Sequence, residues 1–170
     1  MQKRRGSLLL ETLIYISVCT ILIVTAYSFV FMSMKICRRN LATSELREIA
    51  ATVEDRIRYE IGVSVGTGNI EPVKSGKKDK YIEDGYTKTE RLNYVSYNSD
   101  EIGEEPIKKY ISTKKGNIYI GKTSKYQIGN YVDSMYIKKI KINKKPGLNF
   151  IIIYKYGKSR YISRFTVFAN

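Results

Sequence analysis

The 170 residues include 30 Lys and Arg against 16 Asp and Glu, which gives a net charge of +14. The chain contains no His and no Trp, which excludes catalysis by a histidine base and metal sites built on imidazole. Fifteen Tyr and 43% hydrophobic residues favour an ordered chain over a disordered basic tail, because such side chains supply surface to bury. We therefore expect a basic, folded protein that is not an enzyme and needs no cofactor.

A long uncharged segment follows the first few residues. No charged side chain occurs from Thr12 to Met34, and a helix over these positions is about 34 Å long, enough to cross a bilayer. The apolar part of a cleaved secretory signal is shorter and ends at a small-residue cleavage site. We therefore predict a transmembrane helix. Lys3, Arg4 and Arg5 precede it and favour a cytoplasmic amino terminus, with the rest of the chain outside the cytoplasm.

The two cysteines, Cys19 and Cys37, fall within this helical region. Their separation of 18 residues corresponds to about 27 Å along a helix, which no disulfide within the chain can span. We expect both to be structural thiols.

Glu11 stands only a few positions into the apolar stretch. An unpaired charge costs about 2.5–3.5 kcal/mol at the centre of a membrane-spanning helix and less near its ends. One interpretation is that Glu11 marks the cytoplasmic edge of the membrane and reaches water. The other is that a partner outside this helix offsets the cost.

The segment Lys3-Arg4-Arg5-Gly6-Ser7-Leu8-Leu9-Leu10-Glu11, followed by more than twenty apolar residues, resembles the class III signal of type IV prepilins and pseudopilins. The resemblance rests on a short basic leader, Gly6, a Glu five residues later and a long apolar helix. It implies that a prepilin peptidase cuts between Gly6 and Ser7 and methylates the new amine on Ser7. It also implies that Glu11 pairs with the terminal amine of a neighbouring subunit during filament assembly.

The helical pattern continues beyond the apolar run. An apolar stripe recurs at intervals of three and four residues, and its members are Leu46, Ile49, Ala50, Val53, Ile57 and Ile61. Because no Gly or Pro interrupts residues 7–61, we predict one helix over this range that ends at Gly62. The expected organisation is a leader at 1–6, a transmembrane half-helix at 7–34, an amphipathic half-helix at 35–62 and a loop-rich globular domain at 63–170.

The last third of the chain reads as strands. Alternating patterns predict strands at 134–143, 149–156 and 160–168, joined by turns at 144–147 and 157–159. Residues 66–106 are predicted to form long loops with one short strand at 91–97. The fold class is therefore α+β, with a long amino-terminal helix packed on a carboxyl-terminal antiparallel sheet, which is the arrangement that the pilin resemblance also implies.

Two catalytic motifs match by spacing alone. Residues 62–66 fit G-x-S-x-G, but the match follows a helix and the chain has no His base, so a helix stop is expected. Residues 116–123 fit the G-x-x-x-x-G-K-[ST] phosphate loop, which requires a strand before it and a helix after it. Because residues 118–120 read as a strand and 124–130 lack a helical stripe, we predict no nucleotide site here.

The positive charge is concentrated in the last third, where residues 107–170 carry 15 basic residues and a single acid, Asp133. Such a region, interleaved with Tyr, suits DNA or another anionic polymer. The alternatives are a solvated sheet face whose lysines protect its edges, and the composition of an AT-rich genome. The candidate anion-binding residues are Lys138, Lys139, Lys141, Lys144, Lys145, Lys155, Lys158, Arg160 and Arg164.

The leading hypothesis is a minor pilin or pseudopilin, a structural subunit of a type IV pilus, competence or type II secretion filament. Its expected partners are other pilin subunits through the amino-terminal helix, the prepilin peptidase, and the lipid bilayer before assembly. One alternative is a bitopic protein whose basic extracellular domain binds DNA or an anionic envelope polymer. Another is a plain signal anchor in which Gly6 and Glu11 are incidental.

Overall fold

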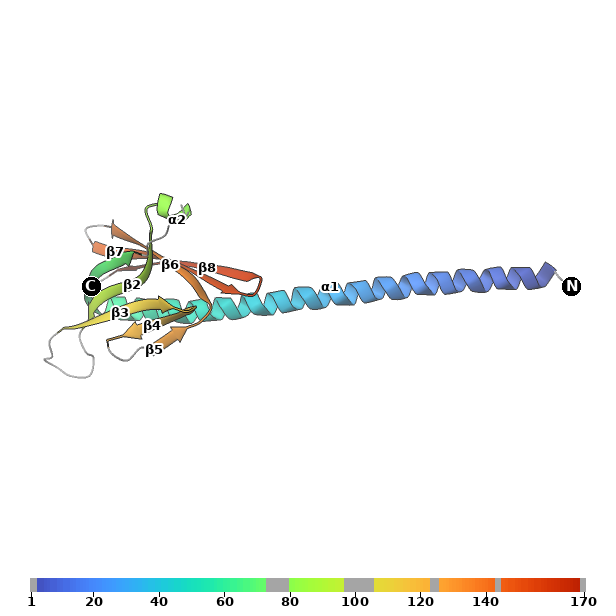
Figure 1. Ribbon diagram of the computed structural model, residues 1–170, viewed down its shortest axis with the longest axis horizontal. Helices are drawn as coiled ribbons and strands as arrows, with labels where there is room; N and C mark the ends of the chain where they lie inside the picture. The colour runs from blue at the N-terminus through green and yellow to red at the C-terminus, as the bar shows by residue number, and fades with distance from the viewer. Residues whose placement is uncertain (1–2, 73–79, 97–105, 123–125, 143–144, 169–170) are drawn as a thin grey trace. The chain divides into compact units, whose positions relative to one another are not determined.

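The computed structural model describes residues 3–72, 80–96, 106–122, 126–142 and 145–168. The chain divides into two compact units, residues 1–41 and 42–170. Figure 1 labels the elements, which are α1 (Lys3–Gly62), β1 (Ser64–Pro72), α2 (Lys80–Glu83), β2 (Thr87–Ser96), β3 (Ile107–Lys114), β4 (Asn117–Gly121), β5 (Tyr126–Gly129), β6 (Val132–Ile142), β7 (Lys145–Tyr156) and β8 (Ser159–Phe168).

The predicted long helix is confirmed, and it begins a few residues earlier than expected, at Lys3. From Leu8 to Leu41 every side chain is exposed. By length and composition, the helix from Leu8 to Gly62 contains a segment that could cross a membrane. In the first unit, α1 therefore has no hydrophobic core of its own to pack against.

The second unit contains the carboxyl-terminal part of α1, whose predicted stripe is buried. Leu46, Val53, Ile57 and Ile61 are fully inaccessible, and they share one core with side chains from the strands. Polar groups reinforce this packing, since the Arg58 guanidinium donates a 2.6 Å hydrogen bond to the carbonyl of Thr166 on β8. The stripe thus holds the helix against the sheet, as amphipathic spacing requires.

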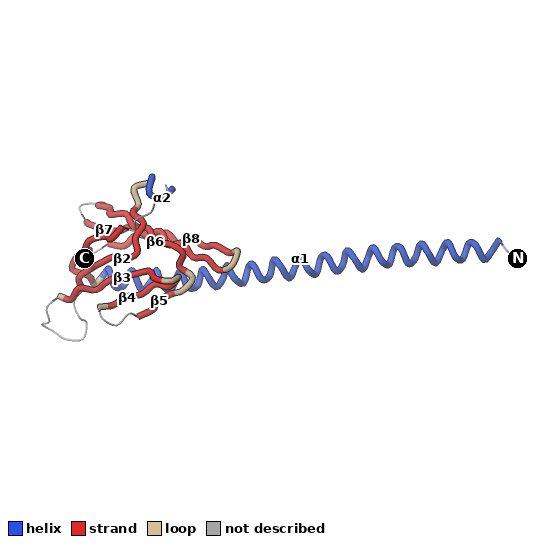
Figure 2. The backbone as a smooth tube through the Cα atoms, in the orientation of Figure 1, coloured by secondary structure: helices blue, strands red, loops and turns tan. Residues whose placement is uncertain are grey.

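The strands form one antiparallel sheet in the order β5-β4-β3-β2-β6-β7-β8, and β1 pairs additionally with β2. Figure 2 shows that strands make up most of the second unit outside α1. The three strands predicted at the carboxyl end correspond to β6, β7 and β8, which form a meander with one register shift, between Val132 and Ser134 of β6. The α+β class, a long helix packed on an antiparallel sheet, is confirmed.

The prediction of long loops at 66–106 is wrong for much of that range. It contains β1, the short α2 and a β2 that begins at Thr87, four residues before the predicted strand. Residues 73–79 and 97–105 of the range, including the last predicted strand residue Tyr97, lie outside the described residues. Glycines at 66 and 68 weaken the strand pattern of β1, which forms because β2 provides a pairing partner.

The turn predicted at 144–147 is also corrected. Lys145, Pro146 and Gly147 belong to β7, where Gly147 pairs with Ile140 of β6 and with Phe168 of β8. A Cβ added at Gly147 would lie 2.9 Å from the Phe168 ring. The glycine thus provides close approach to an aromatic ring rather than a bend. Lys144 lies outside the described residues.

The sheet buries side chains on both faces. The inner face meets α1 and includes Met135, Leu148 and Phe150. On the outer face of β6, β7 and β8, Tyr136 and Ile151 form a smaller cluster, which explains why β7 is buried along most of its length. Tyr81 of α2 covers this cluster, its ring centroid 5.0 Å from that of Tyr136, and Figure 1 shows α2 beside these strands.

Candidate functional site

Three predicted site residues lie near the start of α1. Gly6 and Ser7 are helical, and their side-chain environment is outside what the structure describes. Glu11 is exposed and follows Ser7 by four residues, so the two positions share one side of the helix. Among the described residues, no ion pair involves the Glu11 carboxylate.

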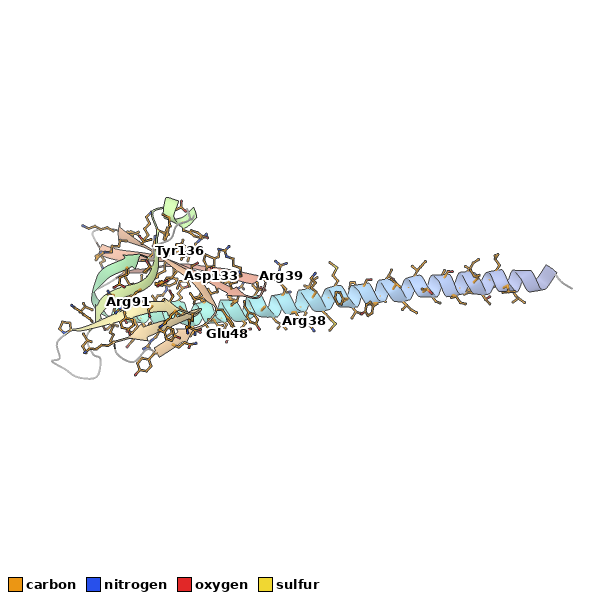
Figure 3. All side chains as sticks on the ribbon, viewed as in Figure 1. Arg38, Arg39, Glu48, Arg91, Asp133 and Tyr136 are labelled. Carbon is orange, nitrogen blue, oxygen red and sulfur yellow. The ribbon has the colours of Figure 1, made fainter. Side chains whose placement is uncertain are left out.

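The hydroxyl groups in the apolar part of α1 are bonded within the helix itself. Thr12, Ser17, Thr20, Thr25 and Ser28 each donate to a backbone carbonyl three or four residues earlier, at 2.7–2.9 Å. Such bonds satisfy polar groups where water is excluded. Figure 3 shows the side chains of this segment projecting outward around the helix. Glu11 is the acid of residues 8–34, and no ion pair of its carboxylate is found among the described residues.

Both cysteines are free and exposed along the same helix. Cys19 lies within the uncharged run, and Cys37 lies beyond it beside two arginines. In the described parts of the chain, no group of three Cys, Asp or Glu residues is placed to hold a metal ion.

The predicted basic residues do not form a single surface. Register places Lys139 and Lys141 opposite Leu148 and Pro146, on the side of the sheet that faces α1. The remaining strand residues of the set lie on the outer face, and Lys158 occupies the turn between β7 and β8. The outer-face members are Lys138, Lys145, Lys155, Arg160 and Arg164.

Lys138 is occupied by contacts within the domain. Its ammonium group donates to the carbonyl of Asp84 at 2.9 Å and lies 5.7 Å from the centroid of the Tyr86 ring. Figure 3 labels Tyr136 on the same outer face, where its ring faces Lys88 at 5.9 Å. Lys138, one of the predicted anion-binding residues, therefore stabilises the segment after α2 against the outer face of the sheet.

The two motifs rejected on sequence grounds have the expected backbone. The Ser64 hydroxyl is buried and donates to the carbonyl of Ile61 at 2.6 Å, which closes the end of α1. Gly116 adopts a positive φ of 77° in the turn between β3 and β4, and Gly121 ends strand β4. Neither stretch has the strand-to-helix geometry that a nucleophile elbow or phosphate loop requires.

A buried carboxylate joins the end of α1 to the sheet. Glu60 is 6% exposed and lies 2.8 Å from the Arg56 guanidinium, while the Tyr94 hydroxyl donates to it at 3.1 Å. Lys109 of β3 lies 3.8 Å away. Burial, reinforced by the Glu60 charge and hydrogen bond, raises the pKa of Tyr94 well above its usual range. Because every group in this network is paired, it serves as structural support.

The structure also brings together cationic residues that the sequence analysis does not predict. Arg91 of β2, Lys108 of β3 and Lys122, directly after β4, line one pocket with Tyr110. Arg91 and Lys122 are 31 positions apart in the sequence. The pairing of β2 with β3 and of β3 with β4 makes these residues neighbours. The available sequence signal is the alternation of Arg91 with Asn93 and of Lys108 with Tyr110 on the side away from the core.

Comparison of the chain with protein-family models, with curated proteins and with solved structures finds no match.

Proposed function

We propose that this chain is a minor pilin or pseudopilin, a membrane-anchored structural subunit that a prepilin peptidase processes between Gly6 and Ser7. The observation that carries the proposal is the exposed, apolar first part of α1 with Glu11, an acid that forms no ion pair among the described residues. The resemblance of residues 3–11 to the prepilin signal supports the position of the cut. The subunit has no catalytic role in this account.

The length of the exposed helix supports a protein partner in addition to lipid. Residues 8–41 span about 51 Å as a helix, whereas a bilayer core is about 30 Å thick. Ile36 and Leu41 lie beyond the uncharged run and are 50% and 65% exposed. Other helices of the same kind would cover these apolar side chains, as they do in bundles.

Glu11 provides the specific contact in this assembly. After cleavage, the terminal amine belongs to Ser7, one helical turn before the carboxylate. A neighbouring subunit displaced along the helix axis would place its own amine opposite Glu11. In surroundings of low dielectric constant, an unpaired carboxylate or ammonium group costs free energy, and pairing the two groups offsets part of that cost. Because the amine comes from a neighbouring subunit, the ion pair favours assembled subunits over isolated ones.

The processing step is tested by intact mass and amino-terminal sequencing of the protein produced with its prepilin peptidase. We expect a chain that begins at Ser7, with or without a methyl group, and a chain that retains its first residues in Gly6→Leu. The control Gln2→Ala, which changes the leader away from the cut, should be processed normally. An uncut chain in all three proteins would refute processing and leave the signal-anchor interpretation.

The assembly step is tested separately with Glu11→Gln. We expect normal cleavage but at least a tenfold loss of subunit from sheared filaments, because the neutral amide cannot balance a buried ammonium group. Glu45→Gln, an exposed acid of the same helix in the second unit, is the matched control. Equal incorporation of both variants would show that Glu11 does not direct assembly.

A further inference from the structure

The outer side of β2 and β3 contains a pocket that encloses about 380 Å³. Paired residues Asn93 and Tyr110 form its floor, and Lys108 lies opposite Val95 on the same side. Lys122 enters from the end of β4, and Gly68 from β1. Figure 3 labels Arg91 at this side of the domain. The pocket lies on the face opposite the core residues Leu92 and Ile111.

Arg91 is held in place at the edge of this pocket. Its guanidinium carbon lies 4.3 Å from the centroid of the Tyr110 ring. This contact orients the planar group, so little conformational entropy is lost on binding. Among the described residues its N–H donors form no ion pair. An arginine stacked in this way is well suited to bind a phosphate with two parallel hydrogen bonds.

The three cations of the pocket are not held in ion pairs with the acids that the structure describes. Within the described parts of the chain, Arg91, Lys108 and Lys122 form no ion pair. Glu71 stands opposite Arg91 in β1, but its carboxylate accepts a hydrogen bond from Asn93 at 3.2 Å instead. With three cations and the single carboxylate of Glu71 described around it, the concave surface carries an excess of positive charge that attracts an anion.

The shape and the other lining groups identify the class of anion. A duplex presents its phosphates on a rigid convex surface, whereas a flexible strand can insert phosphates and a base into a pocket. Tyr110 and the stacked guanidinium provide planar surfaces for a base, and Asn93, whose amide nitrogen donates to Glu71, has an amide oxygen that can accept a hydrogen bond. A polymer with charge but no rings would leave these groups unused.

We propose that this pocket binds a segment of single-stranded nucleic acid, with phosphates on Arg91, Lys108 and Lys122 and a base against the Arg91–Tyr110 stack. The site uses none of the nine basic residues predicted from the sequence. It is independent of the filament proposal, because it depends only on the second unit.

The test measures fluorescence anisotropy of a labelled oligothymidylate with the full chain in nanodiscs of neutral lipid. We expect Arg91→Gln/Lys108→Gln to weaken binding at least tenfold and to reduce the slope of log affinity against log salt by about 0.7 for each lost phosphate contact. The matched control, Lys114→Gln/Lys115→Gln, removes the same charge at the far end of β3, where both lysines are exposed. Equal weakening by both pairs, or no binding by the unchanged protein, overturns the proposal.

Two further measurements separate ring recognition from charge. Tyr110→Leu should weaken oligothymidylate binding about fivefold or more with little change in the salt slope, because it removes stacking but no cation. Inorganic polyphosphate of equal charge and a duplex should compete less well than the oligonucleotide. Competition by polyphosphate as effective as that of the strand would overturn nucleic acid recognition. Lys122→Gln, at an exposed position, keeps the test valid if the double variant fails to fold, and it should reduce the affinity and the salt slope.

Discussion

The two parts of α1 have the same secondary structure and opposite surroundings. Residues 8–41 expose apolar side chains at every side of the helix, whereas residues 42–62 bury one apolar stripe and, next to it, the carboxylate of Glu60. The second part folds against strands of its own chain. The first part buries no apolar side chain from residue 8 to residue 41, and under our proposal lipid or other proteins cover this surface.

The largest effect is expected when the first part of α1 is removed. A chain shortened to residues 36–170 should move from the membrane fraction to the soluble fraction almost completely, because it loses the apolar run but keeps the whole second unit. Ultracentrifugation and circular dichroism measure the two properties. A soluble but unfolded product would mean that the core of the second unit depends on the first.

The next prediction compares one isoleucine in each part. Ile57 is fully buried and Ile23 is 68% exposed. Ile57→Ala should lower the free energy of unfolding by about 2–5 kcal/mol, because it leaves a cavity between helix and sheet. Ile23→Ala should change it by less than about 0.5 kcal/mol. Urea unfolding of both variants in nonionic detergent tests this, and similar losses would contradict the division into two units.

A smaller effect is expected where the helix meets the edge strand β5. A Cβ at Gly129 would collide with Cγ2 of Val53 and lie 3.2 Å from Cγ2 of Ile118. Gly129→Ala should therefore cost about 1–3 kcal/mol, whereas Gly66→Ala, where the Cβ meets no atom within 4 Å, should be nearly neutral. Val53→Ala should relieve part of the Gly129→Ala cost. Urea unfolding of the two single variants and of the double variant measures this relief. If the two losses in free energy of unfolding simply add in the double variant, the steric explanation is excluded.

The smallest prediction concerns alkaline pH. Burial and Glu60 raise the pKa of Tyr94, so the folded chain retains this proton above pH 10 while the unfolded chain releases it. The folded state then binds more protons, and stability falls as the pH rises. Tyr94→Phe should cost about 1 kcal/mol at pH 7 by loss of the hydrogen bond, and its stability should converge with that of the unchanged protein by about pH 11. Urea unfolding measures the difference in the free energy of unfolding between each variant and the unchanged protein. For the control Tyr126→Phe, at an exposed position, this difference should stay constant from pH 7 to 11. A constant difference for Tyr94→Phe as well would contradict the prediction.

Local patterns predict the parts of the fold that are regular on their own. The helix is evident because its stripe recurs without a Gly or Pro from residue 7 to 61, and β6, β7 and β8 are evident from their alternation and length. Strand β1 is not, since Gly66 and Gly68 give little strand preference and its pairing with β2 determines its conformation. Gly147 is misassigned to a turn because sequence gives no sign of the Phe168 ring beside it.

The candidate sites divide in the same way. Gly6, Ser7 and Glu11 lie within one short segment, so a linear motif is enough to propose them, and their role stays a prediction. The basic residues depend on sheet register, and a count of charges cannot show that Lys139 and Lys141 lie on the opposite side from Lys138 and Lys145. The pocket at Arg91 requires knowledge of which strands become neighbours, and this is set by long-range pairing that charge and hydropathy do not encode.

The self-bonded hydroxyls of α1 also affect how neighbouring helices could be aligned. Because Thr12, Ser17, Thr20, Thr25 and Ser28 already have acceptors in their own helix, they contribute little to the preference for any one axial position of a packed neighbour. Sliding such a neighbour by a turn would exchange similar apolar contacts at nearly constant energy. Under our proposal, the axial spacing between subunits in an assembly built from this helix would then be set mainly by the carboxylate of Glu11.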